Sequence, residues 1–187
     1  MIAYHKESLD NHAIVENATD WQAQGYITAE KLAEIRAKFP DKLYSPNWAI
    51  KIGLAVFGSI LFSAVSGFFS MLFNLSSEIS GGFLSILIGI CGLLTLETFI
   101  IRENNHFHSG LDNIFLYSSI CLLMFGIEMI FNWPSLEIGY LLVAVFCLIA
   151  AARYIDSPCA VVGILALLLG IASSINRFAG ENAALIL

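Results

Sequence analysis

Charged residues are scarce in this chain. Lysine, arginine, aspartate and glutamate together make up 13% of its 187 residues, whereas soluble globular domains average about 25%. Hydrophobic residues make up 58%. One core of a soluble domain of this length cannot hide so much apolar sequence when it is gathered into long runs. The composition therefore excludes an ordinary soluble enzyme or binding domain.

Polar interruptions are rare after residue 48. Five apolar segments follow one another, and each approaches the roughly 20 residues that a helix needs to cross about 30 Å of hydrocarbon. The segments are Ala49–Phe73, Phe83–Ile101, Ile114–Phe131, Leu136–Tyr154 and Cys159–Ile175. Because strands of a membrane β-barrel alternate in polarity over about ten residues, continuous segments predict an all-α, polytopic transmembrane helical bundle of about five spans.

Basic residues are missing from two of the four loops. The first loop, Asn74–Gly82, and the third, Asn132–Ser135, have none, and Arg177 is the one basic residue that shares their side. Since lysine and arginine gather on the cytoplasmic side, the pattern predicts a cytoplasmic N-terminus. Residues 1–16 also lack the basic start and apolar run of a cleavable signal peptide. The layout is typical of a bacterial inner (cytoplasmic) membrane protein.

The polar N-terminal segment carries signals for two short helices. Apolar residues recur at helical spacing from Leu9 to Trp21, and Gly25 suits the end of this helix. Thr28 is a suitable N-cap for a second helix, which Pro40 ends. Two helices of this size cannot form a core alone. We expect them to pack on the bundle, on lipid headgroups or on a protein partner.

These patterns divide the chain into three parts. Residues 1–44 form a cytoplasmic amphipathic helical hairpin, residues 45–176 a five-span membrane bundle, and residues 177–187 a short tail or the start of a further helix, capped by Asn182. The chain ends on three large apolar residues. We therefore expect either that it is a fragment of a longer protein or that its last residues fold back along the outer interface.

The run from Trp21 to Glu30, WQAQGYITAE, leads into a basic segment and then into the spans. In this it resembles an uncharacterised family of predicted bacterial multi-pass membrane proteins, which begin with a short helical segment carrying a Gly-x-Ile-Thr/Ser turn. The resemblance implies a membrane protein with more spans than five. It implies no reaction, so no functional residue is carried over from the family.

Paired cysteines are also missing, because Cys91, Cys121, Cys147 and Cys159 occur singly. The second loop holds the remaining candidates for a metal site, namely His106, His108 and Asp112 with Glu97 nearby. Imidazole and carboxylate groups suit Zn²⁺, Mn²⁺ or Fe²⁺. However, a His-x-His pair points to one side only in an extended strand. The alternative is an interfacial loop in which Asp112 caps the third span, and we expect no cofactor.

Two acidic residues fall within the spans. Glu97 lies about one turn from the cytoplasmic end of the second span, and Glu128 about one turn from the outer end of the third. Buried charge is costly in hydrocarbon, so such residues face the bundle, a water path or the interface. For Glu97 the sequence favours the interface or Arg102. For Glu128 no basic residue lies near in sequence, which leaves a transport path open.

Catalytic motifs are absent from the sequence. It has no phosphate-binding GxxxxGK[ST], no dinucleotide-binding GxGxxG and no GxSxG elbow, and its net charge of −6 argues against nucleic acid as a partner. We predict a non-enzymatic membrane protein that docks or senses a protein partner through its N-terminal hairpin. The alternative is a small-solute or ion carrier using Glu128 and Glu97. A third hypothesis is a metal-dependent membrane hydrolase built on the second loop.

Overall fold

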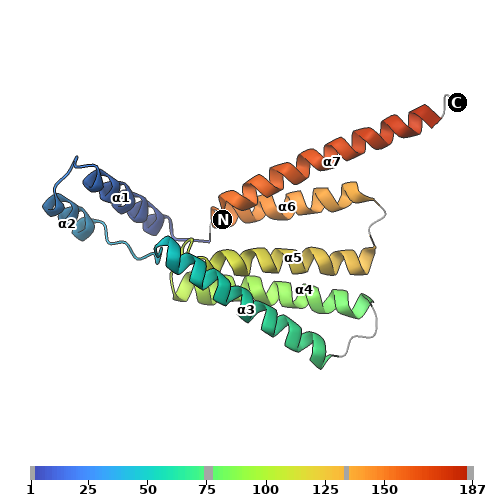
Figure 1. Ribbon diagram of the computed structural model, residues 1–187, viewed down its shortest axis with the longest axis horizontal. Helices are drawn as coiled ribbons and strands as arrows, with labels where there is room; N and C mark the ends of the chain where they lie inside the picture. Colours follow the sequence, from blue (N-terminus) through green and yellow to red (C-terminus); the bar gives the residue numbers. More distant parts are fainter. Residues whose placement is uncertain (1–2, 74–77, 133–134, 185–187) are drawn as a thin grey trace.

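The computed structural model describes residues 3–73, 78–132 and 135–184, with no description of the side chains of residues 78 and 178–184. Helices account for most of these ranges (Figure 1). In chain order they are α1 (Lys6–Ala23), α2 (Ala29–Lys38), α3 (Trp48–Leu72), α4 (Glu78–Thr95), η1 (Leu96–Glu103), α5 (Leu111–Phe131), α6 (Leu136–Tyr154) and α7 (Ser157–Ala184). The predicted all-α architecture is confirmed.

Five helical segments are long and apolar enough to cross a membrane. They are Trp48–Leu72, Ile79–Glu103, Leu111–Phe131, Leu136–Tyr154 and Ser157–Arg177. The prediction of a multi-pass helical membrane protein is confirmed, and the fourth span has the predicted bounds. The largest difference is at the second span, which begins at Ile79 rather than Phe83.

The second span changes its winding before it ends. Helix α4 continues directly into η1, an eight-residue π-helix. At this junction the hydroxyls of Thr95 and Thr98 donate to the carbonyls of Cys91 and Leu94, at 2.9 and 2.7 Å. Such bonds to the preceding turn compete with the helical ladder and bend helices. Glu97 lies in the first turn of this π-helix, and π-helical segments are frequent at functional sites.

Two pairs of helices pack closely. In the α4–α5 pair, a Cβ added to Gly126 would lie 2.6 Å from the Gly82 carbonyl oxygen, so only glycine permits this approach. In the α6–α7 pair, a Cβ on Gly163 would lie 2.8 Å from the Leu148 side chain. The small-residue spacing of the fifth span therefore marks a packing surface, as helices in lipid require.

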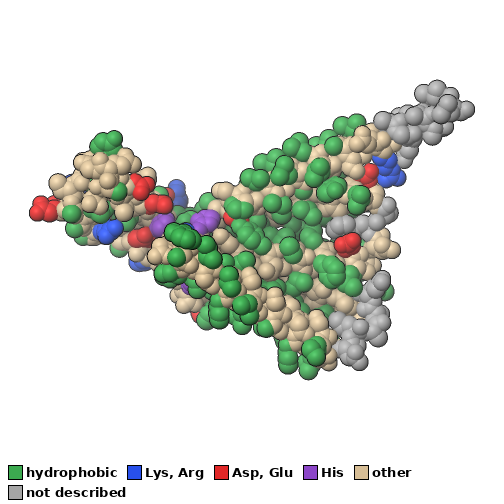
Figure 2. Space-filling view, in the orientation of Figure 1, with side chains coloured by type: hydrophobic (Ala, Val, Ile, Leu, Met, Phe, Trp, Pro, Cys, Tyr) green, Lys and Arg blue, Asp and Glu red, His purple; other side chains and the backbone are tan. Residues whose placement is uncertain are grey.

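The remaining membrane helix, α3, leans on this framework at one end. The Phe62 and Phe115 rings meet edge to face at 5.4 Å, and Gly58 faces the Leu111 side chain of α5. Along the rest of α3 large apolar side chains are exposed, as expected for a lipid-facing helix. Figure 2 shows hydrophobic side chains over the visible faces of all five membrane helices.

The five membrane helices converge at one end and spread at the other (Figure 1). We call the first the polar end: it contains η1, the loop 104–110, the start of α5 and the α6–α7 turn at residues 155–156. We call the other the opposite end. The buried core lies at the polar end and includes Leu96, Ile100, Leu116 and Ala150.

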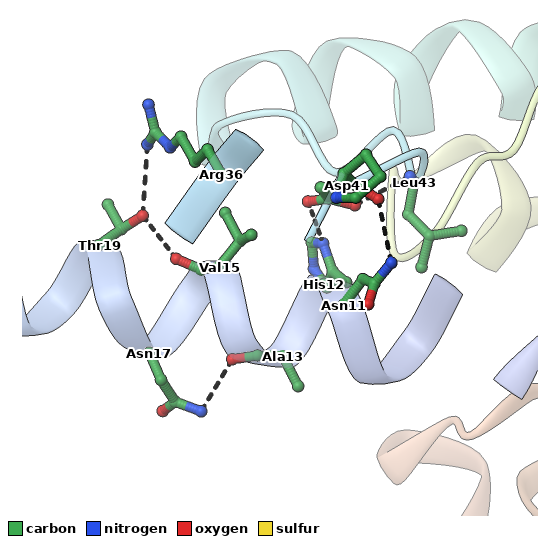
Figure 3. A network of polar contacts seen from close by, with 10 residues as sticks. Asn11, His12, Ala13, Val15, Asn17, Thr19, Arg36, Asp41 and Leu43 are labelled. Atoms are coloured by element: carbon green, nitrogen blue, oxygen red, sulfur yellow. Dashed lines mark hydrogen bonds and ion pairs between the residues drawn. The ribbon is translucent and has the colours of Figure 1, made fainter. Parts of the chain in front are cut away.

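Helices α1 and α2 project from the polar end as an antiparallel pair (Figure 1). Gly25 follows α1 with a left-handed φ of 80°, and the Thr28 side chain accepts a hydrogen bond from the Lys31 N–H at 3.3 Å. Both features match the predicted turn. Figure 3 shows how the pair is tied: His12 bonds to Asp41 at 2.7 Å, and further along α1 Thr19 accepts from the Arg36 guanidinium at 3.3 Å.

The helices divide the chain differently from the prediction at two places. Residues 177–184 continue α7, because no proline follows Arg177 and the single Gly180 does not end a helix. Residues 185–187 of the predicted tail lie outside the described residues. At the other terminus, Tyr4 belongs to the bundle core and not to the N-terminal helices. The Ala3 N–H also donates to the Arg153 carbonyl at 2.9 Å.

Candidate functional site

Polar side chains from five parts of the chain meet at the polar end. We call this set the polar cluster; its members are Tyr4, Glu97, Asp112, Tyr117, Arg153, Tyr154 and Asp156. Buried polar groups destabilise a fold unless they bond to one another. The cluster therefore fixes how the N-terminus, η1, α5 and the α6–α7 turn lie together.

Glu97 has a partner that the sequence does not suggest. Its Oε1 atom accepts from Arg153 Nε at 2.5 Å and from the Tyr154 hydroxyl at 2.8 Å. The sequence favoured the interface or Arg102 for Glu97, whereas its hydrogen-bond partner Arg153 is 56 positions away in sequence and is brought to η1 by the end of α6. A carboxylate with two donors serves here as a bridge between η1 and α6.

Asp112 organises the start of α5. Its Oδ1 atom accepts the N–H groups of Ser109, Gly110 and Asn113 at 2.9 to 3.1 Å, and also the Ser109 hydroxyl at 3.1 Å. These are donors that a helix N-terminus leaves unsatisfied. The predicted capping role of Asp112 agrees with this geometry, although the residue sits inside the first turn and Gly110 holds the cap position.

The two histidines of the second loop point to different neighbours. His106 Nδ1 lies 2.7 Å from the Ser109 hydroxyl, and its ring packs on Tyr44 at 4.9 Å. Burial lowers the pKa of His106, and the negative charge of Asp112 opposes this only in part. His108 has a left-handed φ of 47° and packs on Phe107. The backbone is thus not the extended strand that a His-x-His metal site needs.

The candidate metal ligands are divided between separate contacts. His106 is joined to Asp112 through Ser109, whereas Glu97 is held by Arg153 and Tyr154. Within residues 3–73, 78–132 and 135–184, no group of three His, Cys, Asp or Glu side chains lies close enough to hold a metal ion. His106 instead connects the second loop to the start of α5 through Ser109 and Asp112.

Glu128 lies away from the polar cluster. It is exposed on α5, close to the opposite end, while Glu97 is at the polar end of the neighbouring helix. The same face of α5 carries Tyr117, which bonds to Asp156, and Cys121, which lies near Cys147 of α6. By helical spacing, Glu128 continues this face towards the α6 side. The structure therefore does not bring Glu128 and Glu97 together.

Sequence reasoning missed Tyr4, Tyr117 and Asp156. The Tyr117 hydroxyl donates to Asp156 Oδ1 at 3.1 Å, and this contact spans 39 positions of sequence. Burial and the nearby carboxylates of Asp112 and Asp156 raise the pKa of the Tyr4 hydroxyl, so it stays neutral. The only sequence signal was Asp156 itself, an acidic residue in a very short turn between two spans.

The N-terminal helices are attached to the polar end at two places. The Phe107 ring meets the rings of Tyr4 and His12 edge to face, at 5.1 and 5.3 Å. Farther along, Tyr44 exchanges backbone hydrogen bonds with the loop at Asn105 and Phe107, at 2.8 and 3.1 Å. A pocket of about 460 Å³ lies at this junction, and its wall includes Lys6 of α1 and Arg102 of η1. The contacts connect α1 and α2 to the cluster.

Comparisons with protein-family models, with curated proteins and with solved structures found no significant match for this chain.

Proposed function

We propose that this is a non-enzymatic bacterial inner-membrane protein whose N-terminal helix pair, α1 and α2, is a cytoplasmic docking or sensing module. The observation that carries the proposal is the contrast within this pair. Its base is tied to the bundle through Phe107 and Tyr44, whereas its tip leaves Trp21 51% and Tyr26 75% exposed. Exposed aromatic side chains that lie close together are typical of protein contact surfaces.

Coupling to the membrane is supported by the connections below the pair. His12 of α1 packs on the Phe107 ring of the loop 104–110. In the same loop, the Ser109 N–H donates to Asp112 at the start of α5. Chains of packed rings and hydrogen bonds of this kind carry coupling between sites when they have two arrangements. Docking at the tip would then bias how α5 meets the α6–α7 turn.

Photo-crosslinking in native membranes tests the docking function. A photoreactive amino acid at position 26 should give one protein adduct in good yield, and Trp21→Ala should abolish it. The control places the same group at Glu16, on α1 away from the tip, where we expect no such adduct. Adducts with lipid alone, or equal adducts from both positions, would reject a protein-docking tip.

Reporter fusions test the orientation. Fusions after Lys42 and in the loop 104–110 should lie in the cytoplasm, and fusions in the loop 74–77 should lie outside. An external location for the loop 104–110 would overturn both the orientation and the placement of the docking module.

A carrier function is the second candidate, and the exposed carboxylate of Glu128 favours it. An acidic side chain within a span raises the free energy of the protein in the membrane unless it lines a transport path or binds a partner. Glu128→Gln should leave the yield of folded protein unchanged and abolish cation-driven uptake in proteoliposomes. A large loss of folded protein would instead assign Glu128 to packing.

A further inference from the structure

The pocket between the start of α1 and the end of η1 has a basic part and an apolar part. Its volume is about 460 Å³, within the range of about 300–1,000 Å³ that small-molecule sites occupy. Lys6 and Arg102 supply positive charge to its wall. Ile101 and Leu43 supply apolar side chains, and none of the described residues that line the pocket is an aspartate or a glutamate. The wall therefore suits an anion that is attached to an apolar group.

Both positive charges at the pocket lack an ion-pair partner among the residues that the structure describes. Lys6 and Arg102 are exposed, and the ion pairs of the described chain include neither of them. Glu97 interacts with the charge of Arg102, but its carboxylate is already bonded to Arg153. The glutamates next to Lys6 and Arg102 in sequence do not line the pocket. The pocket thus keeps an excess of positive charge.

The start of α1 adds backbone donors to the same wall. His5 and Ser8 line the pocket beside Lys6, and the His5 side chain makes no capping hydrogen bond. The Leu9 N–H donates to the His5 carbonyl at 3.1 Å. The three N–H groups before it, those of residues 6–8, have no carbonyl partner within the helix. Such groups attract anions such as phosphate, and the helix dipole has the same effect.

The depth of the pocket indicates where the anion comes from. Ile101 and Arg102 lie at the end of the span Ile79–Glu103, which is the level of the lipid headgroups. A phospholipid could place its phosphate near Lys6 and Arg102 and its glycerol next to Ile101 and Leu43. A free phosphate ion would leave the apolar part of the wall empty. Basic pockets beside membrane helices are known sites for anionic headgroups.

We propose that this pocket binds the phosphate of one anionic phospholipid through Lys6, Arg102 and the free N–H groups at the start of α1. Hydrogen bonds from lysine and arginine to phosphate are charge-assisted and therefore strong. A zwitterionic lipid carries its own cation and gains less from the two basic side chains. The site lies at the base of α1 and α2, so it is separate from docking at their exposed tip. The bound lipid would link the start of α1 to the end of η1.

Native mass spectrometry of the full chain in a neutral detergent tests the proposal. Titration with dioleoyl phosphatidylglycerol should give one high-affinity adduct, and dioleoyl phosphatidylcholine should bind about tenfold more weakly. Equal binding of the two lipids, or no adduct with either, would overturn the proposal. Millimolar inorganic phosphate should leave the phosphatidylglycerol adduct in place. Displacement of the lipid by phosphate would assign the pocket to a soluble anion and reject the lipid.

Variants locate the binding. Lys6→Gln and Arg102→Gln should each weaken phosphatidylglycerol binding about tenfold, because each removes a charge-assisted bond. Both side chains are exposed, so we expect the variants to fold, and circular dichroism checks this. The matched control Lys38→Gln removes the same charge from α2, and Arg102→Lys keeps the charge at the pocket; both should bind nearly as the unchanged chain does. An equal loss in Lys6→Gln and Lys38→Gln would indicate diffuse attraction and contradict the site.

Hydrogen exchange tests the backbone donors. Phosphatidylglycerol should slow the exchange of the N–H groups of residues 6–8 several-fold, because these groups then donate to the phosphate. The N–H groups of residues 29–30, at the start of α2, are the control and should exchange at an unchanged rate. Unchanged exchange at residues 6–8 while the lipid is bound would place the lipid elsewhere and overturn the assignment.

Discussion

The two ends of the bundle are built on different principles. At the polar end, hydrogen bonds and buried rings join residues far apart in sequence, as in the pairs Glu97–Arg153 and Tyr117–Asp156. At the opposite end, the described contacts between α6 and α7 include a looser ion pair, Glu137–Arg177, at 3.6 Å. There the helices spread apart and expose apolar side chains.

The difference between the two ends follows from the lipid that surrounds the helices. In lipid, apolar side chains gain little from leaving their surroundings, so helices associate through close packing and polar contacts. The polar end has both close packing and polar contacts. The opposite end has mainly the packing within the α4–α5 pair and within the α6–α7 pair. We therefore expect the same kind of substitution to have unequal effects at the two ends.

Matched glycine substitutions should show the largest difference. Gly110 has φ +93°, and an added Cβ would lie 2.1 Å from the Lys51 carbonyl oxygen. Gly110→Ala should lower the free energy of unfolding by about 3 kcal/mol, through strain and the clash between backbones. Gly67→Ala, on α3 towards the opposite end, meets no atom within 4 Å and should change it by less than about 1 kcal/mol. Unfolding in mixed detergents followed by circular dichroism measures both.

Matched ion-pair substitutions come next. Glu97→Gln should lower the free energy of unfolding by about 2 kcal/mol, because Arg153 then keeps a partly buried charge without its carboxylate. Glu137→Gln should cost less than about 1 kcal/mol, since Arg177 is 59% exposed. Double-mutant cycles with Arg153→Gln and Arg177→Gln isolate each pair. Equal coupling energies would remove the distinction between the ends.

Loosening the attachment of α1 and α2 should have a smaller effect. Phe107→Ala removes the ring contacts with Tyr4 and His12, and of these only the contact with His12, worth about 1 kcal/mol, holds α1. Trypsin should then cleave near Lys42 about five times faster, with the unfolding midpoint of the bundle little changed. Phe131→Ala removes a 70% exposed ring at the opposite end and should leave cleavage unchanged.

The pH dependence should be the smallest effect. Burial lowers the pKa of folded His106 below its unfolded value of about 6.5. The unfolded chain therefore takes up this proton first, so stability is full above about pH 6.5 and falls as the pH drops towards the folded pKa. The unfolding midpoint should decrease slightly from pH 8 to pH 5. His106→Gln should reduce that decrease, whereas His5→Gln, at an exposed position, should not.

Element boundaries were predictable where a single local signal decides them. The fourth span, from Leu136 to Tyr154, is bounded by polar turns on both sides and has the predicted bounds. The Thr28 cap follows from one hydroxyl and the next three residues. The π-helix η1 was not predicted, because its winding depends on side-chain bonds to the preceding turn.

Site residues were predictable only in type. Glu97 and Asp112 stood out as acids near the membrane, and both lie in the polar cluster. Their partners did not stand out, because Arg153 is 56 positions away from Glu97 and Tyr4 lies outside the spans. No local pattern encodes contacts of that separation.

The sequence by itself determined that the chain has five apolar spans suited to a lipid environment and two N-terminal helices. These follow from hydropathy and helix signals that act over fewer than about 25 residues. Only the tertiary structure decided that the chain closes at one end and spreads at the other. It alone brings Tyr4, Asp112 and Asp156 together at the polar end, because burial and charge pairing depend on which helices meet and not on their order in the chain.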